Sequence, residues 1–356
     1  MSEHLLEVRD LAVSFDTYAG EVQAVRGISY YLDKGETLSI VGESGCGKSV
    51  SCQTIMKLLP SPPARIKSGS ILYKGEELVT KTDKQMESYR GKEFSMVFQD
   101  SMTSLNPTMR VGKQLCEGII KHQKVSHEKA REIAIEMLRQ VGLPNPEKTF
   151  RRYPHTLSGG MRQRVMIAIA IACNPQILFA DEPTTALDVT MQAQILDLMN
   201  GLKQKLGTAI ILITHDLGVV AQMADRIAVM YAGKIVESGT ADEIFYNPRH
   251  PYTWGLLGSM PSVEQSSRAA KSELMSIPGT PPDLFAPPKG CAFAARCSYC
   301  MGACLKEDAP EFKADDGHLV HCWLMDGRAP KVTPPVGKHA AVTGSSPERL
   351  PAKEEG

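Results

Sequence analysis

The sequence predicts an α/β fold with a largely parallel core sheet, a helical insert and a small cysteine-rich part at the C-terminus. Short apolar, β-branched runs typical of buried strands occur at residues 37–41, 176–180, 209–214 and 227–231. These runs alternate with helical patterns, which favours a layered α/β architecture. The first run leads directly into a glycine-rich loop, residues 42–49. A strand, a glycine loop and a helix in that order are typical of a phosphate-binding edge of a parallel sheet.

Two further strands precede that loop, and helices dominate the middle of the chain. Residues 6–15 alternate apolar and polar side chains, as a half-buried strand does, and a second strand is expected over 25–32. Residues from about 100 to 172 carry few strand signals, so we expect a mainly helical insert there. One helix should cover 126–142, with Ser126 as its N-cap and Gly142 at its end.

The composition is that of a packed globular protein and excludes some classes of partner. The 356 residues are 42% hydrophobic, and 40 basic residues balance 40 acidic ones. A net charge of zero gives no overall attraction to nucleic acid, so no nucleic-acid partner is expected. The N-terminus lacks a signal peptide, and the densest apolar stretch, Val165 to Cys173, is too short to span a bilayer. We therefore expect a soluble, cytoplasmic chain that reaches a membrane only through partners.

The glycine loop matches the phosphate-binding pattern G-x-x-x-x-G-K-S. Its residues are Gly42, Glu43, Ser44, Gly45, Cys46, Gly47, Lys48 and Ser49. Glycines let backbone N–H groups turn toward phosphates, and the helix that follows adds the positive end of its dipole. We expect Lys48 to reach the β- and γ-phosphates and Ser49 to bind Mg²⁺. A chance glycine turn is the alternative, and the apolar strand before the loop argues against it.

Polar side chains at the ends of three other strands supply the remaining chemistry. Asp181 and Glu182 end one apolar run; Asp181 suits the Mg²⁺ shell and Glu182 suits activation of the attacking water. His215 follows the run 209–214 and should meet them at the carboxyl edge of the sheet. The amide of Gln99, after residues 94–98, can bind Mg²⁺ or its water. Each alone has a structural explanation, and the phosphate-binding loop on the same sheet favours the catalytic interpretation.

A second helix N-terminus suited to an anion begins with Ser158, Gly159 and Gly160. One nucleotide does not need two phosphate cradles from one chain. A second cradle makes sense if it binds the nucleotide of a facing chain, so the sequence predicts a dimer with ATP at its interface.

These residues together resemble the ATP-binding-cassette family. The loop at 42–49, Gln99, the stretch Leu157 to Gln163, the two acids, Ala186 to Asp188 and His215 follow the family's order and spacing. The resemblance implies a RecA-like P-loop cassette domain over 1–258, with a helical subdomain at about 100–172.

The same resemblance implies a head-to-tail dimer and further nucleotide contacts. Each ATP would lie between one chain's P-loop and the Ser158-Gly159-Gly160 segment of the other, with Gln163 in the same motif. Asp188 would bridge the two halves. Phe15 resembles the aromatic residue that stacks on adenine, and Tyr18 is a nearby rival.

Further segments resemble the ATPase subunits of peptide importers, and the "D" type most. They are residues 98–107, 181–190, 249–253 and 290–297. The resemblance implies ATP-driven import of oligopeptides or dipeptides. It also implies a paralogous second ATPase subunit, two integral membrane permease subunits, an extracellular peptide-binding protein and a peripheral position on the cytoplasmic face of the membrane. Residues 101–110 would form the coupling surface. Nickel importers share much of the pattern; a soluble cassette ATPase is less expected, because the chain has one cassette and no heptad run.

The C-terminal part is predicted as an extension over 259–328, followed by a disordered tail over 329–356. Cysteines occupy positions that several peptide-importer ATPases use for a cluster, namely Cys291, Cys297, Cys304 and Cys322. Four thiolates suit a [4Fe–4S] cluster or Zn²⁺. The spacing lacks paired C-x-x-C units, which favours iron–sulfur. Cys300, which forms a C-x-x-C with Cys297, and the histidines at 318 and 321 leave Zn²⁺ as the alternative, and metal-free thiols remain a third.

Overall fold

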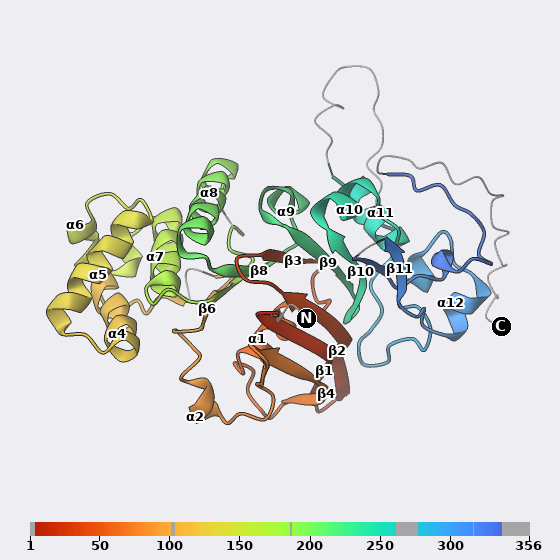
Figure 1. Cartoon of the computed structure of the whole chain (residues 1–356), viewed down its shortest axis with the longest axis horizontal. Helices are drawn as coiled ribbons and strands as arrows, with labels where there is room; N and C mark the ends of the chain where they lie inside the picture. Colours follow the sequence, from red (N-terminus) through yellow and green to blue (C-terminus); the bar gives the residue numbers. More distant parts are fainter. Residues whose placement is uncertain (1–3, 101–103, 186, 261–276, 316, 337–356) are drawn as a thin grey trace, which may run out of the picture.

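The structure is a computed structural model, and it describes residues 4–100, 104–185, 187–260, 277–315 and 317–336. A central sheet lies between a group of helices at one end and the C-terminal part at the other, with a second sheet beside it (Figure 1). Some predicted features lie outside the described residues: 101–103 of the coupling surface, Ala186, much of the connector after 259, and the tail from 337.

The central sheet has eight strands in the order β11-β12-β10-β9-β3-β8-β7-β6. Five of them are parallel neighbours, which confirms the predicted core: β3 (Thr37–Val41), β6 (Phe94–Val97), β7 (Ile177–Asp181), β8 (Ala209–Thr214) and β9 (Arg226–Tyr231). Every residue of β3, β7 and β8 is buried, as expected of strands covered on both faces. The carboxyl ends of β3, β6, β7 and β8 therefore meet at one edge.

The other three strands extend this sheet in antiparallel fashion. They are β10 (Lys234–Thr240), β11 (Phe312–Asp315) and β12 (His318–Val320). Through the β10–β12 pairing, Glu237 lies opposite Val320. The C-terminal part thus adds strands to the core sheet rather than standing apart from it.

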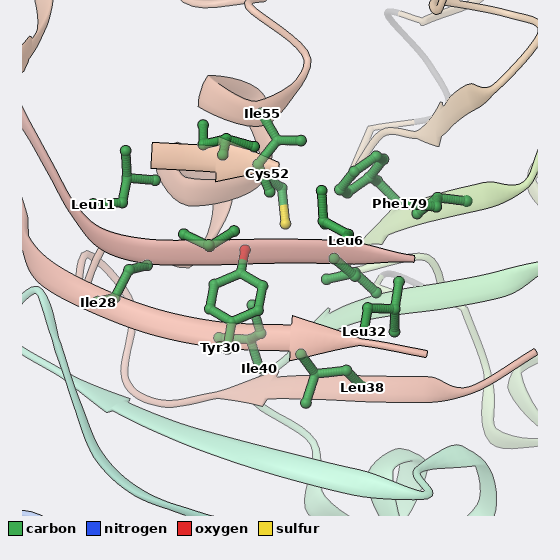
Figure 2. Close-up of a cluster of buried hydrophobic side chains, with 14 of the residues drawn as sticks. Leu6, Leu11, Ile28, Tyr30, Leu32, Leu38, Ile40, Cys52, Ile55 and Phe179 are labelled. Carbon is green, nitrogen blue, oxygen red and sulfur yellow. The ribbon is translucent and has the colours of Figure 1, made fainter. Parts of the chain in front are cut away.

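A second sheet, with the order β2-β1-β4-β5, is entirely antiparallel. Its strands are β1 (Leu6–Thr17), β2 (Gly20–Leu32), β4 (Ala64–Tyr73) and β5 (Glu76–Glu77). Helix α1 (Lys48–Ile55) packs against it: Figure 2 shows Cys52 and Ile55 near Leu6 and Tyr30. The helix that starts at the P-loop is therefore held by a shared apolar core, and Cys52 is a fully buried small apolar side chain.

Helices fill the described residues between β6 and β7, as the lack of strand signals led us to expect. They are α4 (Val111–Gln123), α5 (His127–Gln140), α6 (Pro146–Phe150) and α7 (Gly159–Ile171). Ser126 caps α5 by accepting a hydrogen bond from the Lys129 N–H at 3.3 Å. The further helices of the described residues are α2 (Asp83–Met86), α8 (Val189–Leu206), α9 (Leu217–Met223), α10 (Ala241–Tyr246), α11 (Pro251–Gly258) and α12 (Gly302–Lys306), with short 3₁₀ turns at Pro154–Thr156, Ala294–Arg296 and Trp323–Met325.

Candidate nucleotide-binding site

The loop between β3 and α1 has the backbone of a phosphate cradle. Gly42, Gly45 and Gly47 all have positive φ, at 157°, 79° and 102°. A Cβ on Gly42 would lie 2.0 Å from the Met230 carbonyl oxygen, and one on Gly47 would lie 2.3 Å from the Ala24 carbonyl oxygen. Both approaches are to backbone atoms, so only glycine fits, and the loop's path is fixed by the core behind it.

Lys48 and Ser49 extend from the first turn of α1 into this cradle. The Lys48 ammonium is buried and donates to the carbonyl oxygens of Gly42 at 2.8 Å and Glu43 at 3.0 Å. The Ser49 hydroxyl donates to the Asp181 carboxylate at 2.8 Å. Burial raises the pKa of Asp181, and the bond from Ser49 opposes that rise. Adjacent hydroxyl and carboxylate oxygens are the donor set that Mg²⁺ prefers, so the pair fits the predicted metal position.

Glu182 lies at the centre of a hydrogen-bond network that joins three strand ends. Its carboxylate contacts His215 Nδ1 at 3.1 Å and accepts bonds from Gln99 Nε2 and the Thr185 hydroxyl, each at 2.9 Å. Partial burial raises the pKa of Glu182, but the bonds from His215 and Thr185 outweigh it and leave the pKa below its ordinary value. The backbone of Glu182 has a φ of 46°, a conformation that is uncommon for glutamate and is found most often at functional sites. Glu182 is therefore ionised and oriented, as a general base must be.

Two adjoining cavities lie at this edge. One of about 710 Å³ is lined by residues from β3 and the P-loop, from the Glu182 network, from α9 and α11, and from the C-terminal part: Val41, Gly42, Glu43, Ser44, Gln99, Glu182, Thr185, His215, Leu217, Leu256, Ser259 and Ile277. The other, of about 470 Å³, is lined by Ser49, Gln53, Phe98, Gln99, Asp100, Ser104 and Asp181. The sizes are those of small-molecule sites. The structure thus brings the predicted phosphate, metal and water-activating residues together.

The residues predicted to bind a facing chain's nucleotide do not line these cavities. Ser158 and Gly159 are exposed, and the Ser158 side chain caps α7 by accepting from the Met161 N–H at 3.3 Å. Asp188, also exposed, caps α8 through the Met191 N–H at 2.9 Å. Both motifs are therefore formed and open to solvent.

Gly160 and Gln163 of the same segment face their own chain. A Cβ on Gly160 would lie 2.1 Å from the Met191 side chain. Gln163 is 3% exposed, and its amide donates to the Pro183 carbonyl at 2.5 Å. Gln163 thus links α7 to the segment after Glu182, whereas the sequence had suggested a nucleotide contact.

The two candidates for adenine stacking differ in exposure. Phe15 lies near the end of β1, paired with Val22 and Ala64, and is half-buried. Tyr18 lies in the turn after β1 with its side chain fully exposed. Neither lines the two cavities, so the choice between them stays a prediction.

Sequence reasoning missed two residues that hold the P-loop, Tyr252 on α11 and Arg296 in the C-terminal part. The Tyr252 hydroxyl accepts the Glu43 N–H at 2.9 Å, and the Arg296 guanidinium binds both carboxylate oxygens of Glu43 at 2.7 and 3.0 Å. The segment 249–253 had stood out by its resemblance, which was a signal for Tyr252. Nothing in the sequence pairs Arg296 with a residue 253 positions away.

The cysteines of the C-terminal part lie near one another. Burial raises the pKa of Cys291 to about 11 and that of Cys297 to about 12, and the neighbouring thiols add to both rises. Cys304 and Cys322 are buried beside them. Among the described residues, however, no group of three or more Cys, His, Asp or Glu side chains is arranged to hold a metal ion. The expected metal centre is therefore not supported by this arrangement.

The site as a whole is that of a P-loop nucleotide hydrolase: a glycine cradle with its lysine, a serine hydroxyl on an aspartate whose oxygens fit Mg²⁺, and a glutamate held by histidine. The sequence model of the ABC transporter family matches residues 25–185, and that of the "oligopeptide/dipeptide transporter, C-terminal region" matches 236–304. The chain belongs to the ABC transporter family, and it is an ATP-binding cassette ATPase.

Similar proteins cover almost the whole chain. The oligopeptide transport ATP-binding protein OppD of Bacillus subtilis is 62% identical over 331 residues, covering 93% of this chain and 92% of that protein. The dipeptide transport ATP-binding protein DppD of the same organism is 54% identical, covering 97% and 99%. OppD of Salmonella typhimurium is 48% identical, covering 90% and 93%.

Solved structures share the cassette fold. A dimeric ATP-binding cassette in a post-hydrolysis state with ADP and Pi has a TM-score of 0.60 at 26% identity, covering 66% of this chain and 98% of that one. The Clostridium perfringens protein cbiO1, part of the ABC transporter complex cbiONQ, has a TM-score of 0.58 at 27% identity, covering 68% and 91%.

Within the described residues, no helix has the length and apolar character needed to cross a membrane.

Proposed function

We propose that this chain hydrolyses ATP to power the import of oligopeptides or dipeptides across the cytoplasmic membrane. The observation that carries the proposal is the meeting of Lys48, Asp181, Glu182 and His215 at one sheet edge, in a chain similar over nearly its full length to peptide-transport ATP-binding proteins. The match of residues 236–304 to the peptide-transporter C-terminal region supports peptide as the solute.

In this proposal each residue of the edge has a defined task. The P-loop amides and Lys48 bind the phosphates, while Ser49, Asp181 and Gln99 hold Mg²⁺, which when bound compensates phosphate charge. Glu182 accepts a proton from the attacking water as the water oxygen bonds to the γ-phosphorus and ADP leaves. His215, hydrogen-bonded to the same carboxylate, would orient Glu182 and the attacking water and donate to a γ-phosphate oxygen. These roles rest on the contacts described above and on the family's chemistry.

The active unit we propose is a head-to-tail pair of cassettes. Ser158 and Gly159 are exposed at the start of α7 and would bind the partner's ATP. Asp188 would lie at the interface between the two cassettes. The related cassette solved with ADP and Pi is dimeric, which supports this arrangement. The partner would be a paralogous ATPase subunit. Two membrane permease subunits, supplied by an extracellular peptide-binding protein, would hold the pair peripherally at the cytoplasmic face.

We also propose that the C-terminal thiols bind a [4Fe–4S] cluster in the loaded protein. The sequence positions of Cys291, Cys297, Cys304 and Cys322 and the proximity of their thiols support this. Because the described residues contain no group already arranged to hold a metal ion, loading would require these thiols to rearrange. Protein purified without oxygen should be brown and absorb near roughly 400 nm, as thiolate-bound clusters do. A colourless protein that contains zinc, or no metal at all, by elemental analysis would refute the cluster.

The proposed solute is tested by uptake in cells whose chromosomal copy of this gene is deleted and which express the chain from a plasmid. Labelled oligopeptide and labelled Ni²⁺ are offered separately to cells with the wild type or Lys48→Ala. Peptide uptake that requires Lys48 supports the proposal. Lys48-dependent uptake of Ni²⁺ without peptide uptake would assign the chain to nickel import, and no Lys48-dependent uptake of either would favour a cassette that acts outside transport.

A further inference from the structure

We infer that the C-terminal part completes the nucleotide site, with Arg296 as a positioning residue that neutralises Glu43 and fixes the first turn of the P-loop. The inference rests on the proposed ATPase function and deepens it. It would make ATP affinity depend on a residue far outside the cassette motifs, immediately before Cys297 of the cysteine-rich part.

The contact between Arg296 and Glu43 is a two-pronged ion pair. The two guanidinium nitrogens donate to the two carboxylate oxygens at 2.7 and 3.0 Å. The arginine side chain is only 6% exposed and that of Glu43 is 25% exposed. Bidentate pairs of this kind fix geometry as well as charge, and burial shields this one from solvent screening.

Arg296 is itself held in place by the C-terminal part and by Tyr231 at the end of β9. Its Nε donates to the Pro278 carbonyl at 2.8 Å, and Nη1 also donates to the Tyr231 hydroxyl at 3.1 Å. The guanidinium lies 5.7 Å from the Tyr231 ring centre and 5.9 Å from that of Phe293. An arginine with this many fixed partners is ordered before any ligand arrives, so it can impose a conformation on the loop it binds.

A second contact from the same side fixes the backbone of Glu43. Tyr252 on α11 accepts the Glu43 N–H at 2.9 Å, and its ring packs 4.6 Å from Tyr231 and 5.4 Å from Phe293. Side chain and backbone of one P-loop residue are thus both held by elements beyond β9. Leu256, Ser259 and Ile277 from the same region line the cavity that the P-loop opens into.

The charge of Glu43 is what makes this contact matter for ATP. Glu43 stands between Gly42 and Ser44 and lines the cavity with them, so its carboxylate is no further than one side chain's length from a site proposed to bind a triphosphate. An unpaired carboxylate there would repel phosphates of like charge. Paired with Arg296, whose guanidinium stays protonated, it is neutralised without loss of the loop's shape.

The test measures KM for ATP and kcat on the full-length chain. Arg296→Gln should raise KM about tenfold, equivalent to about 1.4 kcal/mol, with kcat changed less than about twofold. High salt should reduce the difference in KM between Arg296→Gln and the wild type, because it screens the unpaired carboxylate of Glu43. Arg296→Gln combined with Glu43→Gln should return KM toward the wild-type value, because the repulsive charge is gone. Arg296→Lys should be intermediate, since lysine keeps the charge and lacks the fork.

The matched control is Arg328→Gln, an exposed arginine of the same part that binds Asp326, and it should leave KM unchanged. Unchanged KM in Arg296→Gln would overturn the inference. The inference would also be overturned if the double variant had the same raised KM as Arg296→Gln alone, because removing the Glu43 charge would not relieve a purely structural defect. If Arg296→Gln does not fold, Arg296→Lys is the deciding variant. A KM for Arg296→Lys equal to that of the wild type at both low and high salt would overturn the inference. A wild type without ATPase activity would instead refute the proposed function.

Discussion

Replacing His250 with asparagine should make the chain's stability less sensitive to acid. His250 is the N-cap of α11 and is 1% exposed; its Nδ1 accepts the Tyr252 N–H at 3.0 Å. Burial, with a smaller effect of His321, lowers its pKa from 6.5 to about 3. The helix that carries Tyr252 therefore begins at a histidine that stays neutral when folded.

The sign and size of the effect follow from proton linkage. Below pH 6.5 the unfolded chain protonates His250, whereas the folded chain does not until about pH 3. The unfolded state binds more protons in this window, so the free energy of unfolding falls as pH falls. The slope approaches about 1.36 kcal/mol per pH unit, which gives a loss of about 2 kcal/mol by about pH 5.

The assay is denaturant unfolding of wild type and His250→Asn between about pH 7.5 and pH 5. Asparagine keeps an N-cap acceptor but does not titrate, so the difference between the two curves isolates His250. The free energy of unfolding of the wild type minus that of His250→Asn should fall by about 2 kcal/mol from neutral pH to pH 5. His155→Asn, at an exposed position in the helical region, is the control and should run parallel to the wild type. Parallel curves for His250→Asn would refute the reasoning.

Three further predictions concern the nucleotide site. Glu182→Gln should retain ATP binding, accumulate a closed dimer and lose hydrolysis by about 10²-fold or more, the size of a general-base contribution; near-wild-type hydrolysis would remove Glu182 from that role. His215→Ala removes a bond that lowers the pKa of Glu182, so the acid limb of the kcat profile should move to higher pH, and an unmoved limb would contradict the network. Gly47→Ala puts a Cβ 2.3 Å from the Ala24 carbonyl at φ 102°, so nucleotide binding measured by titration should be lost; unchanged affinity would show that the loop can shift.

The parts of the fold predicted correctly are those with a strong local pattern. Strand β8 has the predicted bounds, 209–214, because every residue is apolar or β-branched and buried. Strand β4 was not predicted: Ala64–Tyr73 contains lysine, serine and glycine, and only its later residues are consistently covered. The pairing of β12 with β10 was also missed, since three residues carry no period and the pairing joins segments about 80 residues apart.

The site shows the same division between local and distant signals. The P-loop and the two acids could be predicted because each is a short signature at the end of an apolar strand. The bond from Gln163 to Pro183 and the ion pair from Arg296 to Glu43 could not, because each depends on how separate elements pack. Side-chain direction and long-range partners are properties of the folded chain, and these are what the structure adds.

The central claim is that ATP hydrolysis at this edge drives peptide import, and peptide-dependent ATP hydrolysis tests it most directly. The full assembly, with both ATPase subunits, the permeases and the binding protein, is reconstituted in vesicles with ATP on the side of this chain. Adding oligopeptide on the opposite side should stimulate hydrolysis and load labelled peptide into the compartment with ATP, and Glu182→Gln in this chain should abolish both. Peptide accumulation that persists in Glu182→Gln, or hydrolysis indifferent to peptide, would contradict the account.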